Sequence, residues 1–389
     1  LALRCKPDQN LRATILTDRA AAHLASEKPD EAQADYARAL QCHPKDAVLA
    51  RIYLERGIFH ANGGHHDLAI DDFNDAFGAA KADPQMRALI RNQRGCSYTT
   101  LERYEDAIVD FNEAYACDPT DQELRVQILA GRASAYLKLD RIEEALQDFQ
   151  LALACDLDEH QRLSFQTLFF WCEGAVFTKT NNHKQAIINY DEALRCHPTD
   201  PNLLMLIYYG RGCSKAELEN FGDAITDLSK ALGYDPQDPK MRASILYRRG
   251  CARGCLEEFN LCEVDISAAI ACSPNEDRIQ LFWTRGMARM GLKRYPEAIQ
   301  DYSAAMCINL QDEEWKAQLL YYRGIAHAEN KNPVGARIDW EAALKGTFTK
   351  VGLREQIEAE LNPKTAPPTG KVYAVWGWAM SKWNGGSKK

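Results

Sequence analysis

The 389-residue sequence lacks the features that most directly mark membrane, nucleic-acid-binding and catalytic proteins. No run of eighteen apolar residues occurs, so no membrane-spanning helix is indicated. The formal charge is −8 and the pI about 5.7, whereas a nucleic-acid-binding domain normally carries a basic face. Glycine-rich phosphate loops, HExxH, GxSxG and spaced CxxC pairs are also missing. We therefore expect no enzyme, no cofactor, no metal, and no nucleic-acid or membrane partner.

What the sequence does contain is a repeat. The segment "LERYEDAIVDFNEAYACDPTD" from Leu101 returns as "LDRIEEALQDFQLALACDLDE" from Leu139 and as "LKRYPEAIQDYSAAMCINLQD" from Leu292. We use the alanine of "EDAI" and its equivalents as anchors, which recur at a mean spacing of 38 residues. The nine anchors are Ala32, Ala69, Ala107, Ala145, Ala186, Ala224, Cys262, Ala298 and Ala336. Such a fixed period is typical of an array of stacked units rather than of separate domains.

Residue sizes around each anchor predict a pair of packed helices. Glycine or alanine stands twelve residues before every anchor and alanine seven residues after it. A large residue, usually aromatic, stands four residues after the anchor. Small residues let two helices approach closely, and the apolar spacing of four and seven residues is that of an amphipathic helix. Several second helices run into a proline, as in "CHPKD" and "CDPTD", which ends the helix.

This pattern of two small residues, a large residue, an alanine and a Pro-Asp turn resembles the tetratricopeptide repeat family, although the period is about four residues longer than the family's. The resemblance implies an all-α, right-handed superhelical solenoid of about nine helix-turn-helix repeats whose concave groove holds a protein or peptide. We expect an N-terminal extension over 1–12, repeats over 13–348 and a capping helix over 349–362. A proline-containing linker and an aromatic tail would follow over 363–389.

Arginine and aspartate recur together at fixed distances from the anchor. Arginine stands thirteen residues before it and aspartate three residues after it in eight of the nine repeats. The fifth repeat replaces both, with Glu173 and Asn189, which suggests that the two residues touch. We interpret the pairs as structural pins between the two helices, represented by Arg94 with Asp110, Arg132 with Asp148, and Arg211 with Asp227.

Most of the thirteen cysteines also recur in register. Equivalent positions in neighbouring repeats lie too far apart for a disulfide, so the cysteines predict small buried fillers and a reducing, cytoplasmic compartment. The absence of an Asn-x-Ser/Thr sequon favours the same location. Cys251, Cys255 and Cys262 come close together on two facing helices, where core packing, a redox pair and a metal site all stay open. Since the sequence begins at Leu1 rather than Met, a targeting segment ahead of it also stays open.

In the family, the residues two before, two after and five after the arginine face the groove. The first of these positions is aromatic throughout the second half of the sequence, and Met287 and Met290 occupy the other two in one repeat. Aromatic side chains are common anchors at interfaces. The predicted groove residues are Trp171, Tyr209, Tyr247, Trp283, Met287, Met290 and Tyr321. The alternative is that these rings pack between successive repeats.

The tail "KVYAVWGWAMSKWNGGSKK" is too aromatic for a solvated linker. Its candidate anchors are Tyr373, Trp376, Trp378 and Trp383, which either fold back on the last repeats or insert into a neighbour. The function that the sequence favours is a non-catalytic scaffold or adaptor in a large intracellular assembly, with the cytoskeleton or the cilium suggested by family analogy. The alternatives are a soluble receptor for a peptide motif and a regulatory subunit of an enzyme complex.

Overall fold

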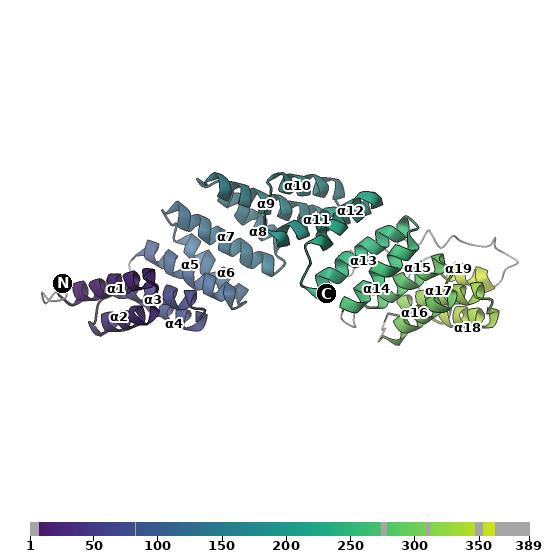
Figure 1. The fold of residues 1–389 in the computed structure, drawn as a ribbon, viewed down its shortest axis with the longest axis horizontal. Helices are drawn as coiled ribbons and strands as arrows, with labels where there is room; N and C mark the ends of the chain where they lie inside the picture. The colour runs from purple at the N-terminus through teal and green to yellow at the C-terminus, as the bar shows by residue number, and fades with distance from the viewer. Residues whose placement is uncertain (1–7, 82, 274–277, 309–311, 347–352, 362–389) are drawn as a thin grey trace. The chain divides into compact units, whose positions relative to one another are not determined.

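The computed structural model describes residues 8–81, 83–273, 278–308, 312–346 and 353–361. Within these ranges the chain forms nineteen α-helices and no β-strand, so the fold is all-α (Figure 1). The first eighteen helices form nine antiparallel hairpins, each with a first and a second helix. The predicted solenoid of nine helix pairs is confirmed.

The first helix of each hairpin carries the arginine, and the second carries the anchor and the aspartate. The first helices are α1 (Gln9–Ala25), α3 (Asp46–Asn62), α5 (Pro84–Thr100), α7 (Gln122–Lys138), α9 (Glu159–Lys179), α11 (Pro201–Glu217), α13 (Pro239–Cys255), α15 (Arg278–Gly291) and α17 (Glu313–Glu329). The second helices are α2 (Pro29–Gln41), α4 (His66–Ala79), α6 (Tyr104–Ala116), α8 (Ile142–Leu153), α10 (His183–Arg195), α12 (Phe221–Gly233), α14 (Phe259–Cys272), α16 (Tyr295–Cys307) and α18 (Pro333–Ala343). The last helix, α19, is Leu353–Leu361.

The chain divides into two compact units between Glu173 and Gly174, inside α9. Unit 1 comprises residues 1–173 and unit 2 residues 174–389. In each unit the second helix of one hairpin packs against the first helix of the next, as α6 does on α7 and α14 on α15. Successive first helices also touch, for example α5 and α7 in unit 1 and α11 and α13 in unit 2.

The turn inside every hairpin has the same backbone conformation. Its middle residue, five positions before the anchor, has a positive φ in all nine hairpins, such as 59° at Glu102. The N–H of Arg103 then donates to the carbonyl of Tyr98 at 2.9 Å, and the N–H of Glu102 donates to that of Thr99 at 3.1 Å. These bonds use carbonyl groups that the end of α5 would otherwise leave unsatisfied. A single left-handed residue therefore reverses the chain in every repeat.

Aspartate begins many of the first helices. Asp83 accepts hydrogen bonds from the N–H groups of Gln85 and Met86, and Pro84 occupies the first helical position. Proline fits there because the missing N–H would have had no partner inside the helix. Asp8 caps α1 in the same way, so α1 begins at Gln9, inside the range 1–12 that we expected to precede the repeats.

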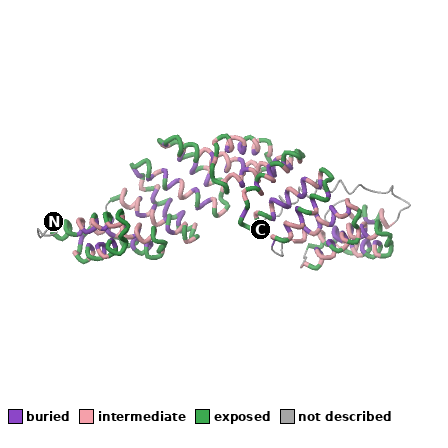
Figure 2. The backbone as a smooth tube through the Cα atoms, in the orientation of Figure 1, coloured by how far each residue is buried: buried purple, intermediate pink, exposed green. Residues whose placement is uncertain are grey.

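The large residue four positions after each anchor fills the space between three helices. Phe111 of α6 is fully buried, and the ring lies against two glycines, Gly95 of α5 and Gly131 of α7. A β-carbon at Gly131 would lie 2.6 Å from the ring, closer than atoms can pack. Each hairpin thus joins the first helix of the next around one ring, and buried residues follow the inner sides of the helices (Figure 2).

At the C-terminal end, α19 covers the last hairpin. Ile357 is fully buried in one cluster with Tyr321 of α17 and Trp340 of α18. The rest of α19 is mostly polar, with Glu355, Glu358 and Glu360 on it. A helix with one buried apolar side and one polar side gives a stacked array the capped end that it needs.

Candidate protein-interaction face

All eight predicted arginine–aspartate pairs are ion pairs in the structure, and each joins the two helices of one hairpin. In the third hairpin, Arg94 Nε lies 2.7 Å from Asp110 Oδ2 and Nη2 lies 2.5 Å from Oδ1. The pairs Arg132 with Asp148 and Arg211 with Asp227 have the same two-pronged geometry. The aspartates are almost fully buried, so each carboxylate depends on its arginine for compensation.

The arginine also contacts the preceding hairpin, which the sequence analysis did not anticipate. Arg94 Nη1 donates to Asn74 Oδ1 of α4 at 2.6 Å, and Arg132 Nη1 donates to Asn112 Oδ1 of α6 at 2.7 Å. In unit 2, Arg249 and Arg323 donate to serine hydroxyls at the equivalent position. That position, five residues after the anchor, is asparagine, aspartate or serine in six of the nine repeats, and this recurrence was the available signal. One guanidinium thus ties a hairpin internally and to its predecessor.

Three of these aspartates in unit 2 have a second cation, and so does Asp35 of unit 1, where Arg38 lies 3.1 Å away. Lys215 lies 2.8 Å from Asp227, Arg253 lies 2.7 Å from Asp265, and Arg289 lies 2.8 Å from Asp301. In unit 1 the balance differs from one hairpin to the next. The hydrogen bond from Arg19 holds the pKa of Asp35 below its usual value, whereas burial raises the pKa of Asp148 despite Arg132.

The position two before the arginine is buried in six of the nine hairpins, three in each unit, while Ala130 of unit 1 is partly exposed. In unit 1 it holds Thr17, Leu54 and Asn92, which are at most 4% exposed. In unit 2 the rings of Tyr247, Trp283 and Tyr321 are at most 7% exposed, while Tyr209, like Trp171 of unit 1, is partly exposed. Because the burial does not depend on the residue type, the position is one of packing between neighbouring first helices.

The contacts of Trp283 show where such a ring lies. Its ring meets Trp315 and Tyr322 of α17 edge to face, with centroids 5.9 and 5.8 Å apart. Similarly, the Tyr247 hydroxyl accepts a hydrogen bond from Gln280 of α15 at 2.6 Å. Tyr247 and Trp283 thus contact the next repeat in this structure, as in the alternative, and Tyr321 is buried in the cluster that contains Ile357 of α19. Their assignment as partner-binding residues stays a prediction.

Met287 and Met290 are also buried, with exposed fractions of 1% and 7%. Both lie in the same apolar cluster as Trp283 and Tyr302, so neither is open to a partner in this structure. Among the predicted groove residues only Trp171 and Tyr209 keep partial exposure. The open part of the first-helix face must be sought elsewhere.

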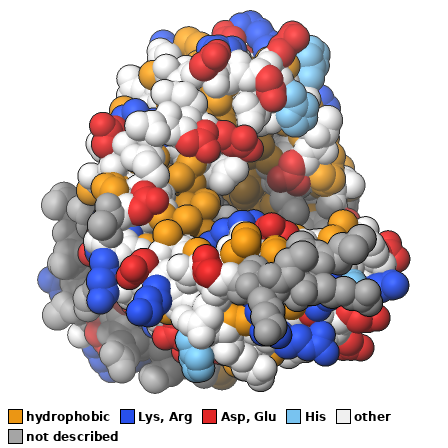
Figure 3. Space-filling view, turned by 90° about the vertical axis from the view of Figure 1, so that its left-hand side faces the viewer, with side chains coloured by type: hydrophobic (Ala, Val, Ile, Leu, Met, Phe, Trp, Pro, Cys, Tyr) orange, Lys and Arg blue, Asp and Glu red, His pale blue; other side chains and the backbone are white. Residues whose placement is uncertain are grey.

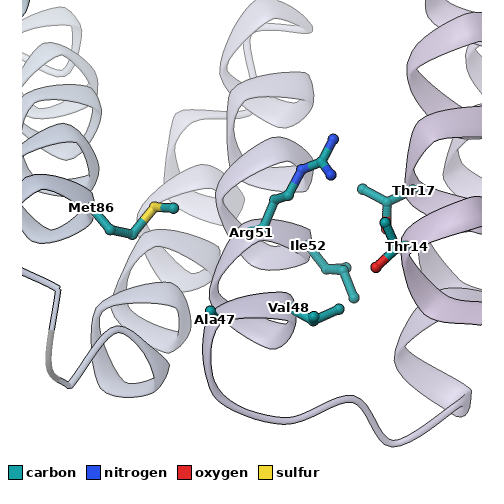
Figure 4. A pocket seen from close by; sticks show the side chains of 7 residues that line it. All are labelled: Thr14, Thr17, Ala47, Val48, Arg51, Ile52 and Met86. Atoms are coloured by element: carbon teal, nitrogen blue, oxygen red, sulfur yellow. The ribbon is translucent and has the colours of Figure 1, made fainter. Parts of the chain in front are cut away.

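Unit 1 has a pocket on its first helices that the sequence analysis missed. It has a volume of about 270 Å³ and lies among α1, α3 and α5 (Figure 4). Its lining comprises Thr14 and Thr17 from α1, Ala47, Val48, Arg51 and Ile52 from α3, and Met86 from α5. A second pocket, of about 240 Å³, shares Ala47 and Met86 with it, so the hollow continues toward the start of α5.

Charged groups stand beside this pocket. Arg51 Nε donates to Glu55 Oε1 at 2.7 Å, and Nη2 donates to Asp18 Oδ1 at 2.8 Å. Burial alone would lower the pKa of Arg51, but the hydrogen bonds of the two carboxylates raise it. The side chains of Asp18 and Arg51 are 57% and 43% exposed. The rim therefore holds two carboxylates and one guanidinium, a net negative charge beside an apolar floor.

The pocket is small and lies at the surface of the helices. Small-molecule sites usually have volumes of about 300–1,000 Å³, whereas this pocket is smaller and lies open on a helix face. The hydroxyls of Thr14 and Thr17 already donate to carbonyls of their own helix. What the surface can do is accept one or two side chains of another polypeptide.

The comparisons with known proteins agree with this architecture. The family model for the tetratricopeptide repeat matches three segments, residues 88–121, 126–158 and 207–238. These three segments of the chain are similar to the tetratricopeptide repeat. Members of this family are generally scaffolds for interactions between proteins, and their fold is typically a non-catalytic module.

Several solved structures are similar to parts of this chain at low sequence identity. The repeat chain resembles MamA of Desulfovibrio magneticus RS-1, with 16% identity, a TM-score of 0.41, and coverage of 46% of this chain and 94% of that one. It resembles YrrB, described as a TPR protein with an unusual peptide-binding site, with 19% identity, a TM-score of 0.39, and coverage of 52% and 93%. It also resembles a tetratricopeptide repeat protein from Parabacteroides merdae, with 18% identity and a TM-score of 0.31. That match covers 80% of this chain and 99% of the other one. No curated protein matches the sequence.

The cysteine cluster of the repeat protein is a part of its core. Cys251 and Cys262 are fully buried, and Cys255 packs against the same apolar cluster. Burial raises the pKa of the Cys251 and Cys255 thiols to about 12. Thiols with such pKa values are poor nucleophiles and poor metal ligands. Within the described ranges no three His, Cys, Asp or Glu side chains are grouped to hold a metal ion.

The face of the repeat protein shown in Figure 3 is mixed in charge. Asp and Glu side chains are interspersed with Lys, Arg and apolar residues on the face shown in Figure 3. Among the described helices, none is both long and apolar enough to span a bilayer. The tail residues Tyr373, Trp376, Trp378 and Trp383 lie outside the described residues.

Proposed function

We propose that the protein is a non-catalytic scaffold that binds a segment of another protein on the first-helix face of unit 1. The observation that supports this most is the open pocket among α1, α3 and α5, with an apolar floor at Val48, Ile52 and Met86. Nothing in the construction of the hairpins requires this hollow, because the pins and the aromatic clamps lie between the helices.

The partner's chemistry follows from the floor and the rim. An apolar side chain, aliphatic or aromatic, matches the floor, where burial releases water from both surfaces. The carboxylates of Asp18 and Glu55 outnumber the guanidinium of Arg51 on the rim. A lysine or arginine next to the apolar residue would therefore be attracted, so the proposed ligand is a segment with an apolar anchor flanked by basic residues.

The test compares two valines, one on a first helix in the pocket and one on a second helix of the next hairpin. A photo-reactive amino acid is placed at Val48, in the pocket, and in a second variant at Val109, which is 55% exposed on α6. The protein from its native source is irradiated in its assembly, and cross-linked partners are identified by mass spectrometry. We expect one defined partner from Val48 and not from Val109. Equal adducts from both positions, or none from Val48, would contradict the proposal.

A substitution series then measures affinity. Val48→Asp places a charge on the apolar floor and should weaken binding of the identified segment at least tenfold, while Val109→Asp should leave it unchanged. Dissociation over hours within a large complex would support a scaffold. Micromolar, rapidly reversible binding of a free peptide would support the alternative of a soluble motif receptor.

The assembly itself belongs to the proposal. A cytoplasmic setting, in the cytoskeleton or the cilium, is supported only by analogy with long, regular repeat arrays. Cross-links from Lys45, which directly precedes α3, and from Lys81, which lines the second pocket, would name the neighbouring chains in that assembly.

A further inference from the structure

At one position of the first helices, three side chains of unit 1 are exposed and three of unit 2 are buried. The residue two after the arginine is exposed in α1, α5 and α7, where it is Ala21, Cys96 and Ser134. In α11, α13 and α15 the same position holds Cys213, Cys251 and Met287, which are 8%, 0% and 1% exposed. The hairpins have the same turns and the same pins in both units. The difference in exposure therefore does not come from the turns or from the pins.

A buried charge on the same face strengthens this contrast. The residue directly before the pin arginine is Asp18 in α1, with a side chain 57% exposed, but in α13 it is Arg248, which is 3% exposed. Arg248 Nη1 pairs with Glu217 of α11 at 3.2 Å. Shielding a guanidinium from water this completely is costly, so it occurs only where surrounding groups displace the solvent.

The chain itself contains a segment with the chemistry to cover such a face. Residues 371–383 read "KVYAVWGWAMSKW", and four aromatic side chains in them have no role in the repeats. The segment and its flanks, residues 363–389, hold five lysines and no aspartate or glutamate, whereas the chain as a whole is acidic. The aromatic side chains of the tail would pack on an apolar face, and the lysines would be attracted by the net negative charge of the repeats.

Its length is sufficient. The tail follows α19, which packs on the hairpin of α17. Neighbouring first helices lie about 10 Å apart, so reaching α13 or α11 takes a few tens of ångströms. A chain of about twenty extended residues, the stretch from α19 to the end of the aromatic segment, spans up to about 70 Å. The sequence "PKTAPPTG" also favours an extended path at the start of the tail.

We propose that residues 371–383 lie on the first-helix face of unit 2, over α11, α13 and α15, as an intramolecular ligand. The aromatic side chains of the tail then cover Cys213, Cys251 and Met287, and the open face of unit 1 is left for other proteins. This inference does not rest on the proposed partner of unit 1.

Hydroxyl-radical footprinting read by mass spectrometry tests the proposal in the full chain, because sulfur side chains react readily and report their exposure. The variant is Trp376→Ala with Trp378→Ala and Trp383→Ala, and the control is Lys388→Ala with Lys389→Ala. In the aromatic variant we expect oxidation of Cys213, Cys251 and Met287 to rise at least tenfold. Oxidation of the exposed Cys96 and Cys307 should stay constant, and the lysine control should match the unaltered chain. An unchanged footprint would overturn the proposal, since the repeats would then cover their own face.

Two further readouts guard against misfolding and against exchange between molecules. Cys172 is fully buried in unit 1, so a parallel rise there would reveal general unfolding. In that event, lysine cross-linking of the unaltered chain tests whether the tail lies on unit 2. Links from Lys371 or Lys382 to Lys240 or Lys316 support the proposal, and their absence overturns it. In a mixture of isotopically light and heavy chains, predominant light–heavy links would mean that the tail of a second copy is bound, which would also overturn it.

Discussion

The fifth hairpin and the other eight are held together by different chemistry. Eight hairpins use a charged pin, as Arg94 and Asp110 do in the third. In the fifth, Asn189 is buried and donates to the carbonyl of Gln185 on its own helix, at 3.3 Å. Instead, hydroxyls join three helices there: Thr178 Oγ1 lies 3.2 Å from the Tyr190 hydroxyl and 3.1 Å from Ser214 Oγ.

This comparison shows which features of a hairpin are essential. The left-handed turn residue and the large residue packed against small ones are present in all nine hairpins, whereas the charged pin is not. The turn conformation and the packing of the large residue are therefore common to every hairpin, whereas the polar contact between its two helices varies. The two compact units also divide inside α9, at the hairpin without a charged pin.

The largest expected effect is the loss of a pin carboxylate. Asp110→Ala should destabilise by about 3–5 kcal/mol, because Arg94 is left largely buried without compensation. Asp265→Ala should cost more, since two guanidiniums, Arg249 and Arg253, lose their partner. Asn189→Ala should cost only about 1 kcal/mol. Denaturant unfolding measures all three variants.

A double variant sharpens the same point. Arg94→Glu with Asp110→Asn copies the fifth hairpin into the third and should do less harm than Asp110→Ala alone, because no buried cation is stranded. Equal thermal shifts for the two would show that the residues do not act as a pair.

The next effect tests shape in both kinds of hairpin. Gly131→Ala and Gly210→Ala should each destabilise by about 1–3 kcal/mol, because the added methyl groups meet the rings of Phe111 and Tyr190. Gly222→Ala is the matched control, since nothing lies within 4 Å of its site, and it should be neutral or stabilising by up to about 1 kcal/mol. A cost confined to Gly131, measured by thermal unfolding, would mean that the fifth hairpin does not share the clamp.

Removing two tyrosine hydroxyls should have smaller effects on stability, and the two effects should have opposite signs. Tyr190→Phe removes a bonded hydroxyl and should destabilise by about 1 kcal/mol. The Tyr302 hydroxyl is buried with no hydrogen-bond partner among the described residues, so Tyr302→Phe should stabilise by a similar amount. Differential scanning calorimetry distinguishes the two signs, and shifts in the same direction would refute the assignment of the hydroxyl network.

The smallest effect is pH dependent. Burial raises the pKa of Glu173 above its usual value, so the folded state disfavours the charged form. Below a pH of about 4.5 the carboxyl is protonated in both the folded and the unfolded chain, so it does not weaken folding. As the pH rises through the folded pKa, ionising the partly buried carboxyl lowers the free energy of unfolding. Glu173→Gln should therefore stabilise slightly at pH 7, within about 0.5 kcal/mol, and make no difference near pH 4. A melting-temperature series across pH that is flat, or reversed, would contradict this.

The repeat register was predictable because each hairpin constrains the same few positions in the same way. Glycine at Gly95, a ring at Phe111 and alanine at Ala107 follow from the spacing of two packed helices, and the loss of both pin residues at Glu173 and Asn189 revealed the pairing. The contact from Arg94 to Asn74 was missed because the relevant recurrence spans two repeats and varies between asparagine, aspartate and serine.

The sequence by itself determined the helix pairs, their period and the residues that pin them, because these interactions are local and repeat nine times. Only the tertiary structure decided which positions of the first helices are open. Tyr247 and Trp283 looked like groove residues, yet the close approach of neighbouring first helices buries them. Val48 and Met86 carry no such signal, yet they line a pocket. Exposure on a stacked array depends on the neighbouring repeat and on whatever lies over it, which the pattern within one repeat does not encode.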